Sequence, residues 1–286
     1  MELAAGTVAL IVITFFAAFV NGALGYGFSS LTVPVALLFH SNRILNPALV
    51  VVEVFINLYV LFLNRSAIPV VWRRVLPILI GLVPGIALGS YVIASLHPAT
   101  LKLGTYTLLL PLILVQAAGL RRPIKSEKAF GLPFGAGLGF LYSVTTISGP
   151  PMAVFFNNQG FVKKDFRAGL ALIRVGESVL TAIAYWHLGL YVAQSQSLFW
   201  AILPSVIIGI PLGAYVIRRL DAETFRRICM SFDVWVVGFG LARVLLELKL
   251  AQGAAAYGPM LAAGLLDIYL LYTYFRNRSR PALAAA

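Results

Sequence analysis

The sequence contains few charged residues, one cysteine and three histidines. Only 11% of its 286 residues are charged, and residues 3–42 contain no Asp, Glu, Lys or Arg. The single cysteine, Cys229, excludes an internal disulfide, and no group of Cys and His has the spacing of a metal site. We therefore expect neither redox chemistry nor a bound metal or other cofactor.

No Lys or Arg precedes the first apolar run, so the sequence lacks the positively charged start of a cleaved signal peptide. The first segment is therefore expected to remain in the mature protein.

Hydrophobic residues make up 60% of the chain, and apolar runs long enough to cross a bilayer recur from end to end. This pattern predicts an all-α polytopic membrane protein. The segments expected to cross the membrane once are 44–63, 75–96, 101–120, 168–190, 198–217, 228–248 and 259–275.

The net charge of +12 comes from basic residues in short loops between apolar runs, as the positive-inside rule expects of a cytoplasmic face. These residues are Arg65, Arg73, Arg74, Arg121, Arg122, Lys125, Lys128, Lys163, Lys164, Arg167, Arg218, Arg219, Arg226, Arg227, Arg276, Arg278 and Arg280. The loops at 40–43, 97–100, 191–197 and 249–258 carry almost none and are expected to face outward. The charge therefore indicates a cell-membrane protein with a cytoplasmic C-terminus, and no nucleic-acid partner.

The run from Ala129 to Val162 has basic loops at both ends, so it is expected to enter the membrane and return. As one helix its 34 residues would span about 51 Å, against a hydrocarbon core of about 30 Å. Its centre, SVTTISGPP at 143–151, ends in Gly-Pro-Pro, where helix continuation is disfavoured. Two half-helices are therefore predicted here.

The chain is internally duplicated. GIALGSYVIASL at 85–96 and GIPLGAYVIRRL at 209–220 match at eight of twelve positions, displaced by 124, and PVALLF at 34–39 resembles PMAVFF at 151–156, displaced by 117. The loop charges give the two copies opposite orientations, which predicts an inverted repeat. We expect a first repeat at 1–120, a second at 121–248, and an additional span with a basic tail at 249–286.

The stretch NGALGYGFSS at 21–30 occupies the position of the broken hairpin in the first repeat, and its glycines weaken the helix there. This glycine-rich break, its counterpart ending in SGPP, and a G-x-x-L-G-x-Y segment in each half resemble the TauE/SafE sulfite exporter family of permeases over residues 7–247. The resemblance implies transport of a small anion, often sulfur-containing, such as sulfite, a sulfonate or sulfoacetate.

Interrupted helices expose backbone N–H groups and a positive dipole end, which favour an anion without a dedicated basic side chain. The residues expected to form this site are Asn21, Gly22, Gly25, Tyr26, Gly27, Ser29 and Ser30 in the first half, and Ser143, Thr145, Thr146, Ser148, Gly149 and Pro150 in the second. The alternative is that these hydroxyls only satisfy backbone groups freed by the breaks.

Ionisable groups inside spans usually face a cavity, because they are costly in lipid. Glu53, with Asn57 one turn later, is a candidate proton carrier, the alternative being a structural hydrogen-bond acceptor. Arg174 is a candidate for attracting the anion, but a pair with Glu177 three residues on is favoured. Asp267 is assigned to packing or assembly. Asp233 is expected to pair at the interface with Arg226 or Arg227.

Nucleotide binding, membrane-embedded catalysis and an anion channel are the competing functions. GALGYG has no preceding strand and no Lys-Ser/Thr, so neither a dinucleotide site nor a P-loop is supported. A membrane-embedded enzyme with Ser148 as nucleophile lacks a His at matching depth. An anion channel remains an alternative to a carrier, and the sequence is compatible with a homo-oligomer.

Overall fold

The computed structural model describes residues 2–25, 27–118, 127–158, 163–216, 219 and 221–278. Over these residues the chain forms helices and no strand, which confirms the predicted all-α class. The helices are α1 (Glu2–Leu24), α2 (Phe28–Ala36), α3 (Asn42–Leu63), α4 (Ile68–Ser95), α5 (Pro98–Ala118), α6 (Glu127–Thr145), α7 (Gly149–Asn158), α8 (Lys163–His187), α9 (Ala193–Val216), α10 (Ala222–Glu247) and α11 (Gly258–Arg278), with short 3₁₀ turns at Arg65–Ala67 and Gly253–Tyr257.

Across the described residues, eight helices are long and apolar enough to cross a membrane: α1, α3, α4, α5, α8, α9, α10 and α11. Every predicted single crossing corresponds to one of them. Helices α4, α8 and α10 begin several residues earlier than expected, because their basic first turns are helical rather than loop. At α10 the Asp221 carboxylate accepts a hydrogen bond from the Thr224 amide at 2.9 Å, which caps the early start.

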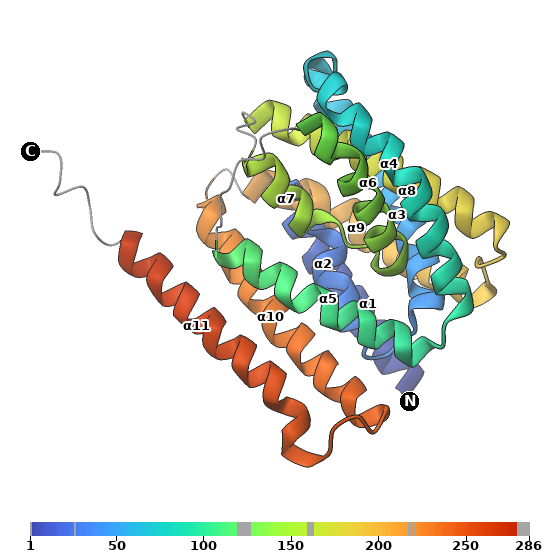
Figure 1. Ribbon diagram of the computed structural model, residues 1–286, viewed down its shortest axis with the longest axis vertical. Coiled ribbons are helices and arrows are strands. Elements are labelled where there is room, and N and C mark those ends of the chain that lie inside the picture. Colours follow the sequence, from blue (N-terminus) through green and yellow to red (C-terminus); the bar gives the residue numbers. More distant parts are fainter. Residues whose placement is uncertain are drawn as a thin grey trace, which may run out of the picture.

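The first glycine-rich segment is a helical hairpin rather than a single broken span. Helix α1 packs against α2, and a Cβ atom placed on Gly6 would lie 3.3 Å from the Cβ of Phe39. The residues after α2 therefore return to the beginning of α1, as Figure 1 shows in dark blue.

Helices α6 and α7 form a second hairpin. Phe134 of α6 stacks on Phe155 of α7 with ring centroids 4.6 Å apart, and Phe130 lies 6.2 Å from the same ring. The start of α6 and the end of α7 are therefore close, so this run enters and turns back as expected (Figure 1).

Glycines allow two pairs of helices, α1 with α9 and α4 with α6, to approach closely. A Cβ on Gly213 of α9 would lie 1.8 Å from the carbonyl oxygen of Phe19 on α1. A Cβ on Gly85 of α4 would lie 2.0 Å from the carbonyl oxygen of Ala136 on α6. The repeated G-x-x-L-G motif therefore serves backbone-to-backbone helix packing.

Helices α3 and α8 pack against each other, and α5 packs against α10. Helix α11 lies at one edge beside α10, where Asp267 accepts a hydrogen bond from Ser231 of α10 (Figure 1). Large apolar side chains such as Trp186, Tyr269 and Leu265 are exposed, as expected of a surface that faces lipid.

Candidate substrate site

The break between α1 and α2 depends on two glycines in left-handed backbone conformations. Gly25 has φ +83°, and Gly27, the N-cap of α2, has φ +106° and ψ −1°. Side-chain-bearing residues rarely adopt such conformations, so the chain can reverse here at little cost only with glycine. Tyr26, between them, lies outside the described residues.

The break between α6 and α7 is formed by Thr145 and Thr146. Thr146 has φ +57°, a strained value for a β-branched residue, and its amide donates to the Tyr142 carbonyl at 2.6 Å. The Thr145 hydroxyl accepts from the Ile147 amide at 3.1 Å. Helix α7 then begins with Gly149 and two prolines, which fit the first turn because amides there have no intrahelical partner.

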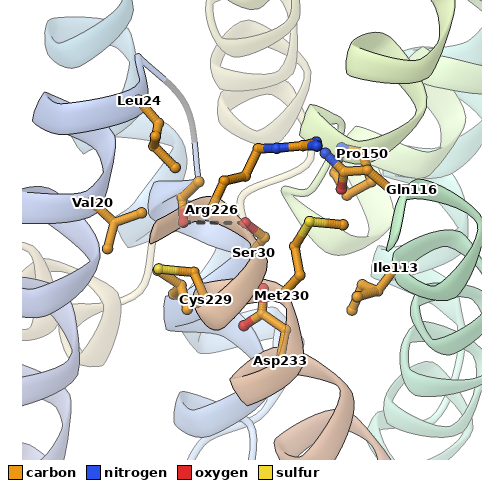
Figure 2. Close-up of a pocket in the computed structure, with 12 residues that line it drawn as sticks. Val20, Leu24, Ser30, Ile113, Gln116, Pro150, Arg226, Cys229, Met230 and Asp233 are labelled. Carbon is orange, nitrogen blue, oxygen red and sulfur yellow. Dashed lines mark hydrogen bonds between the residues drawn. The ribbon is translucent and has the colours of Figure 1, made fainter. Parts of the chain in front are cut away.

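A cavity lies where the N-terminal ends of α2 and α7 approach each other (Figure 2). Its volume, taken as the space open to the centre of a water-sized sphere, is about 20 Å³, so in this conformation the cavity is nearly closed. The lining residues are Val20 and Leu24 of α1, Gly27, Ser30 and Leu31 of α2, Ile113 and Gln116 of α5, Pro150 of α7, and Arg226, Cys229, Met230 and Asp233 of α10. The two helix breaks thus open onto one cavity that α5 and α10 complete.

The polar groups of this cavity include hydrogen-bonding atoms that have no partner within the described part of the chain. Gln116 is 6% exposed, and its Nε2 donor is buried and unpaired. Arg226 extends its guanidinium across the cavity toward Gln116 and Pro150 (Figure 2), while also bonding Glu223 at 2.6 and 3.0 Å. Positive charge, an unused amide donor and two helix N-termini therefore converge here.

A buried ionic network links both hairpins to α3 and α8. Glu53 of α3 accepts hydrogen bonds from Arg174 of α8 at 2.9 Å, Ser29 of α2 at 2.6 Å and Tyr142 of α6 at 2.6 Å. The side chains of Glu53 and Arg174 are 0% and 4% exposed. The Glu53 carboxylate therefore has a cation and two hydroxyl groups as donors.

A second buried carboxylate, Glu177 of α8, has one hydroxyl donor. Ser148, at the α6–α7 break, donates to its Oε2 atom at 2.6 Å, and its Oε1 atom has no hydrogen-bond partner. The predicted pair of Arg174 with Glu177 is wrong. Arg174 pairs instead with Glu53, because α3 packs against α8 and brings the Glu53 carboxylate within reach.

The structure brings only part of the predicted site to the cavity. Gly27, Ser30 and Pro150 line it, whereas Ser29 and Ser148 bond the two buried carboxylates behind it. The remaining predicted residues have other surroundings. Gly22 packs on the backbone of Ile210. The hydroxyls of Ser143, Thr145 and Thr146 donate to the backbone carbonyls of Gly139, Leu141 and Thr145, respectively. Asn57 donates to the Arg174 carbonyl at 3.3 Å, and both polar side-chain atoms of Asn21 are buried with no partner among the described residues.

Sequence reasoning missed the contributions of α5 and α10. Arg226 was assigned to a cytoplasmic loop, yet it lies in α10 at the cavity. Asp233 was expected to pair with Arg226 or Arg227, yet it is buried, with an unpaired Oδ1 atom, while Arg226 bonds Glu223. The displacement of 124 continues past the matched segments, where PATLK at 98–102 aligns with AETFR at 222–226, and so relates Lys102 to Arg226.

Apolar helices long enough to cross a bilayer, hairpins broken near a cavity that contains Arg226, Asp233 and Gln116, and buried ionic groups together define a polytopic membrane transporter. A family model described as Sulfite exporter TauE/SafE matches residues 10–239, so the chain belongs to this family and the predicted resemblance is confirmed. No curated protein and no solved structure matches the chain.

Proposed function

We propose that the protein is a secondary transporter that carries a small anion across the cell membrane by alternating access. The observation that supports this most directly is the cavity at which the N-terminal ends of α2 and α7 meet beside Arg226 and Gln116. The first turn of α2 has free amides, and both helices present a positive dipole end, so an anion there gains backbone donors from α2 and a favourable field from both hairpins. Pro150 and Pro151 at the start of α7 have no N–H to donate. Enzymatic catalysis is not expected in a transporter family.

The substrate proposed is a sulfur oxyanion or a small sulfonate, such as sulfite or sulfoacetate. Such anions offer several acceptor oxygens around one centre, which suits donors arriving from α2, α5 and α10. The family description agrees with this class of substrate.

The inverted repeat is supported by equivalent contacts in the two halves. A Cβ on Gly22 would meet Ile210 of α9, and a Cβ on Gly139 would meet Ile86 of α4. These positions are related by the displacements of 117 and 124 found in the sequence. Glu53 and Glu177 are also related by 124, and each accepts from a serine of the hairpin in its own half.

A second and larger cavity, of about 200 Å³ measured in the same way, supports alternating access. It lies at the other end of the antiparallel α5–α10 pair, and its lining includes Lys102, Tyr106, Arg243 and Glu247. Lys102 corresponds to Arg226 by the displacement of 124. The proposed cycle opens one basic cavity to each side of the membrane in turn.

The proposed orientation predicts that reporters fused after Lys128 and after Lys163 are both cytoplasmic, because these residues flank one hairpin. A reporter fused at the C-terminus should also be cytoplasmic. Accessibility labelling in intact cells and in inverted vesicles measures each position. Opposite locations for the first two reporters would contradict the inverted arrangement.

Substituting Arg226 by Gln is expected to weaken anion binding about tenfold to a hundredfold, because one charge-assisted interaction of roughly 1.5–3 kcal/mol is lost. Binding is measured by thermal stabilisation of purified protein with sulfite, sulfoacetate, methanesulfonate, sulfate and acetate. A ligand at a hundred times its Kd stabilises by about 2.7 kcal/mol, which is readily detected.

The matched control is Glu223→Gln, which removes the carboxylate that pairs with Arg226 and leaves the guanidinium in place. We expect this variant to bind at least as tightly as the wild type. Equal losses in both variants would indicate disturbance of the first turn of α10 rather than loss of a ligand contact. Saturable counterflow of labelled anion in proteoliposomes would distinguish a carrier from a channel.

A further inference from the structure

We infer that Asp233 is the proton-binding group that couples anion binding to protons, an inference that rests on the proposed function of the cavity. Asp233 lies on α10, two turns from Arg226, and lines the same cavity. Asp233 is 4% exposed, and its Oδ1 atom is buried with no hydrogen-bond partner among the described residues. An acidic side chain at an anion site requires an explanation, because two negative charges in one cavity repel each other.

Among the described residues, no Lys or Arg forms an ion pair with Asp233. In Figure 2 the guanidinium of Arg226 reaches toward Gln116 and Pro150, while Asp233 lies at the other end of the cavity. The other side chains that line the cavity are Val20 and Leu24 of α1, Ser30 and Leu31 of α2, Ile113 and Gln116 of α5, Pro150 of α7, and Arg226, Cys229 and Met230 of α10, and of these only Arg226 is charged. On α11, which packs beside α10, the Asp267 carboxylate accepts a hydrogen bond from the Ser231 hydroxyl.

Three carboxyl groups are candidates for the proton, and their surroundings differ. Glu53 is held by Arg174, Ser29 and Tyr142, so loss or gain of a proton there would disrupt the contacts that join both hairpins. Glu177 bonds Ser148 and does not line the cavity. Asp233 lines the cavity and has an unpaired oxygen, so its charge acts directly on the anion.

The coupling follows from electrostatics. When the Asp233 carboxylate takes up one proton, it becomes a neutral carboxylic acid, and the repulsion between it and the anion disappears. The anion therefore binds the protonated form preferentially, and one proton travels with one anion. By linkage, anion binding in turn favours proton uptake at Asp233.

The test measures anion affinity between about pH 5.5 and about pH 8.5 in the wild type and in Asp233→Asn. Methanesulfonate, sulfoacetate and sulfate are the probes, because all three stay fully ionised over this range, whereas sulfite itself titrates within it. Wild-type affinity should fall by up to about tenfold for each pH unit once Asp233 ionises. Asp233→Asn, which mimics the neutral acid, should bind as tightly as the wild type at low pH and keep that affinity at high pH.

Two further variants complete the test. Asp233→Leu has a similar volume and also cannot ionise, so it should likewise lose the pH dependence if Asp233→Asn does not fold. Asp267→Asn, a buried carboxyl of α11 outside the cavity, should keep the wild-type slope. If affinity falls with pH as steeply in Asp233→Asn or Asp233→Leu as in the wild type, or if wild-type affinity does not depend on pH, the assignment of Asp233 is wrong while the proposed function stands. Absence of binding of every probe to the wild type at all pH values would overturn the proposed function as well.

Discussion

Substituting Arg174 by Leu is expected to lower the free energy of unfolding by about 3–5 kcal/mol. The Glu53 carboxylate would keep the hydroxyl donors of Ser29 and Tyr142 but lose its only ion-pair partner among the described residues. A buried charge without a counter-ion is far more costly than the pair is favourable, because its desolvation is no longer compensated. Denaturant unfolding in detergent micelles measures the loss.

The double variant Arg174→Leu, Glu53→Gln should recover a large part of this loss. The Gln carbonyl oxygen can still accept a hydrogen bond from Ser29 or Tyr142, and no unpaired charge remains. Glu177→Gln is the matched control, because Glu177 forms no ion pair with any described residue and the Gln amide oxygen can still accept from Ser148. We expect its free energy of unfolding to fall by about 1 kcal/mol or less. If the double variant is no more stable than Arg174→Leu, the buried charge of Glu53 is not the cause.

Substituting Gly213 by Ala is expected to destabilise the fold by about 3 kcal/mol or more, the upper end of what overpacking usually costs. The added methyl group would lie 1.8 Å from the Phe19 carbonyl oxygen and 2.7 Å from its carbon, both backbone atoms that cannot rotate away. Helices α1 and α9 would have to separate. The yield of monodisperse protein and its unfolding midpoint report the effect.

Gly104→Ala provides the control for this substitution. Gly104 lies within α5, and a Cβ there would meet nothing within 4 Å. Because Ala favours a helix over Gly by about 1 kcal/mol, this variant should be as stable as the wild type or slightly more so. Equal stability of Gly213→Ala and Gly104→Ala would show that α1 and α9 do not require close backbone contact.

Much of the fold could be predicted from the sequence because its determinants are local. Apolar length identifies the spans, and Gly25, Gly27 and the Gly149–Pro151 segment identify the breaks through their backbone preferences. The family was also recognisable from these motifs and their repetition. The sequence is a weaker guide to where helices begin. Basic residues indicate a loop, but the first turns of α4, α8 and α10 contain such residues and are helical.

The partners of the charged residues could not be predicted, because they depend on which helices meet. Spacing along α8 predicted an Arg174–Glu177 pair, but the packing of α3 on α8 places Glu53 within reach of Arg174. The contributions of Gln116, Arg226 and Asp233 to the cavity likewise arise from the crossing of α5 and α10 near the hairpins. No local sequence pattern predicts that crossing.

The packing of α1 on α9 also constrains the order in which the protein can be assembled in a cell. Helix α1 ends at Leu24, whereas α9 begins at Ala193, so the ribosome must synthesise the intervening chain before α1 meets its partner. At about 5–20 residues per second this delay is on the order of ten seconds or more. During that time the glycine surface of α1 must be covered by lipid, the insertion machinery or a chaperone. The N-terminal half released alone should therefore be a substrate for membrane proteases, whereas the two halves synthesised together as separate chains have the contacts needed to assemble.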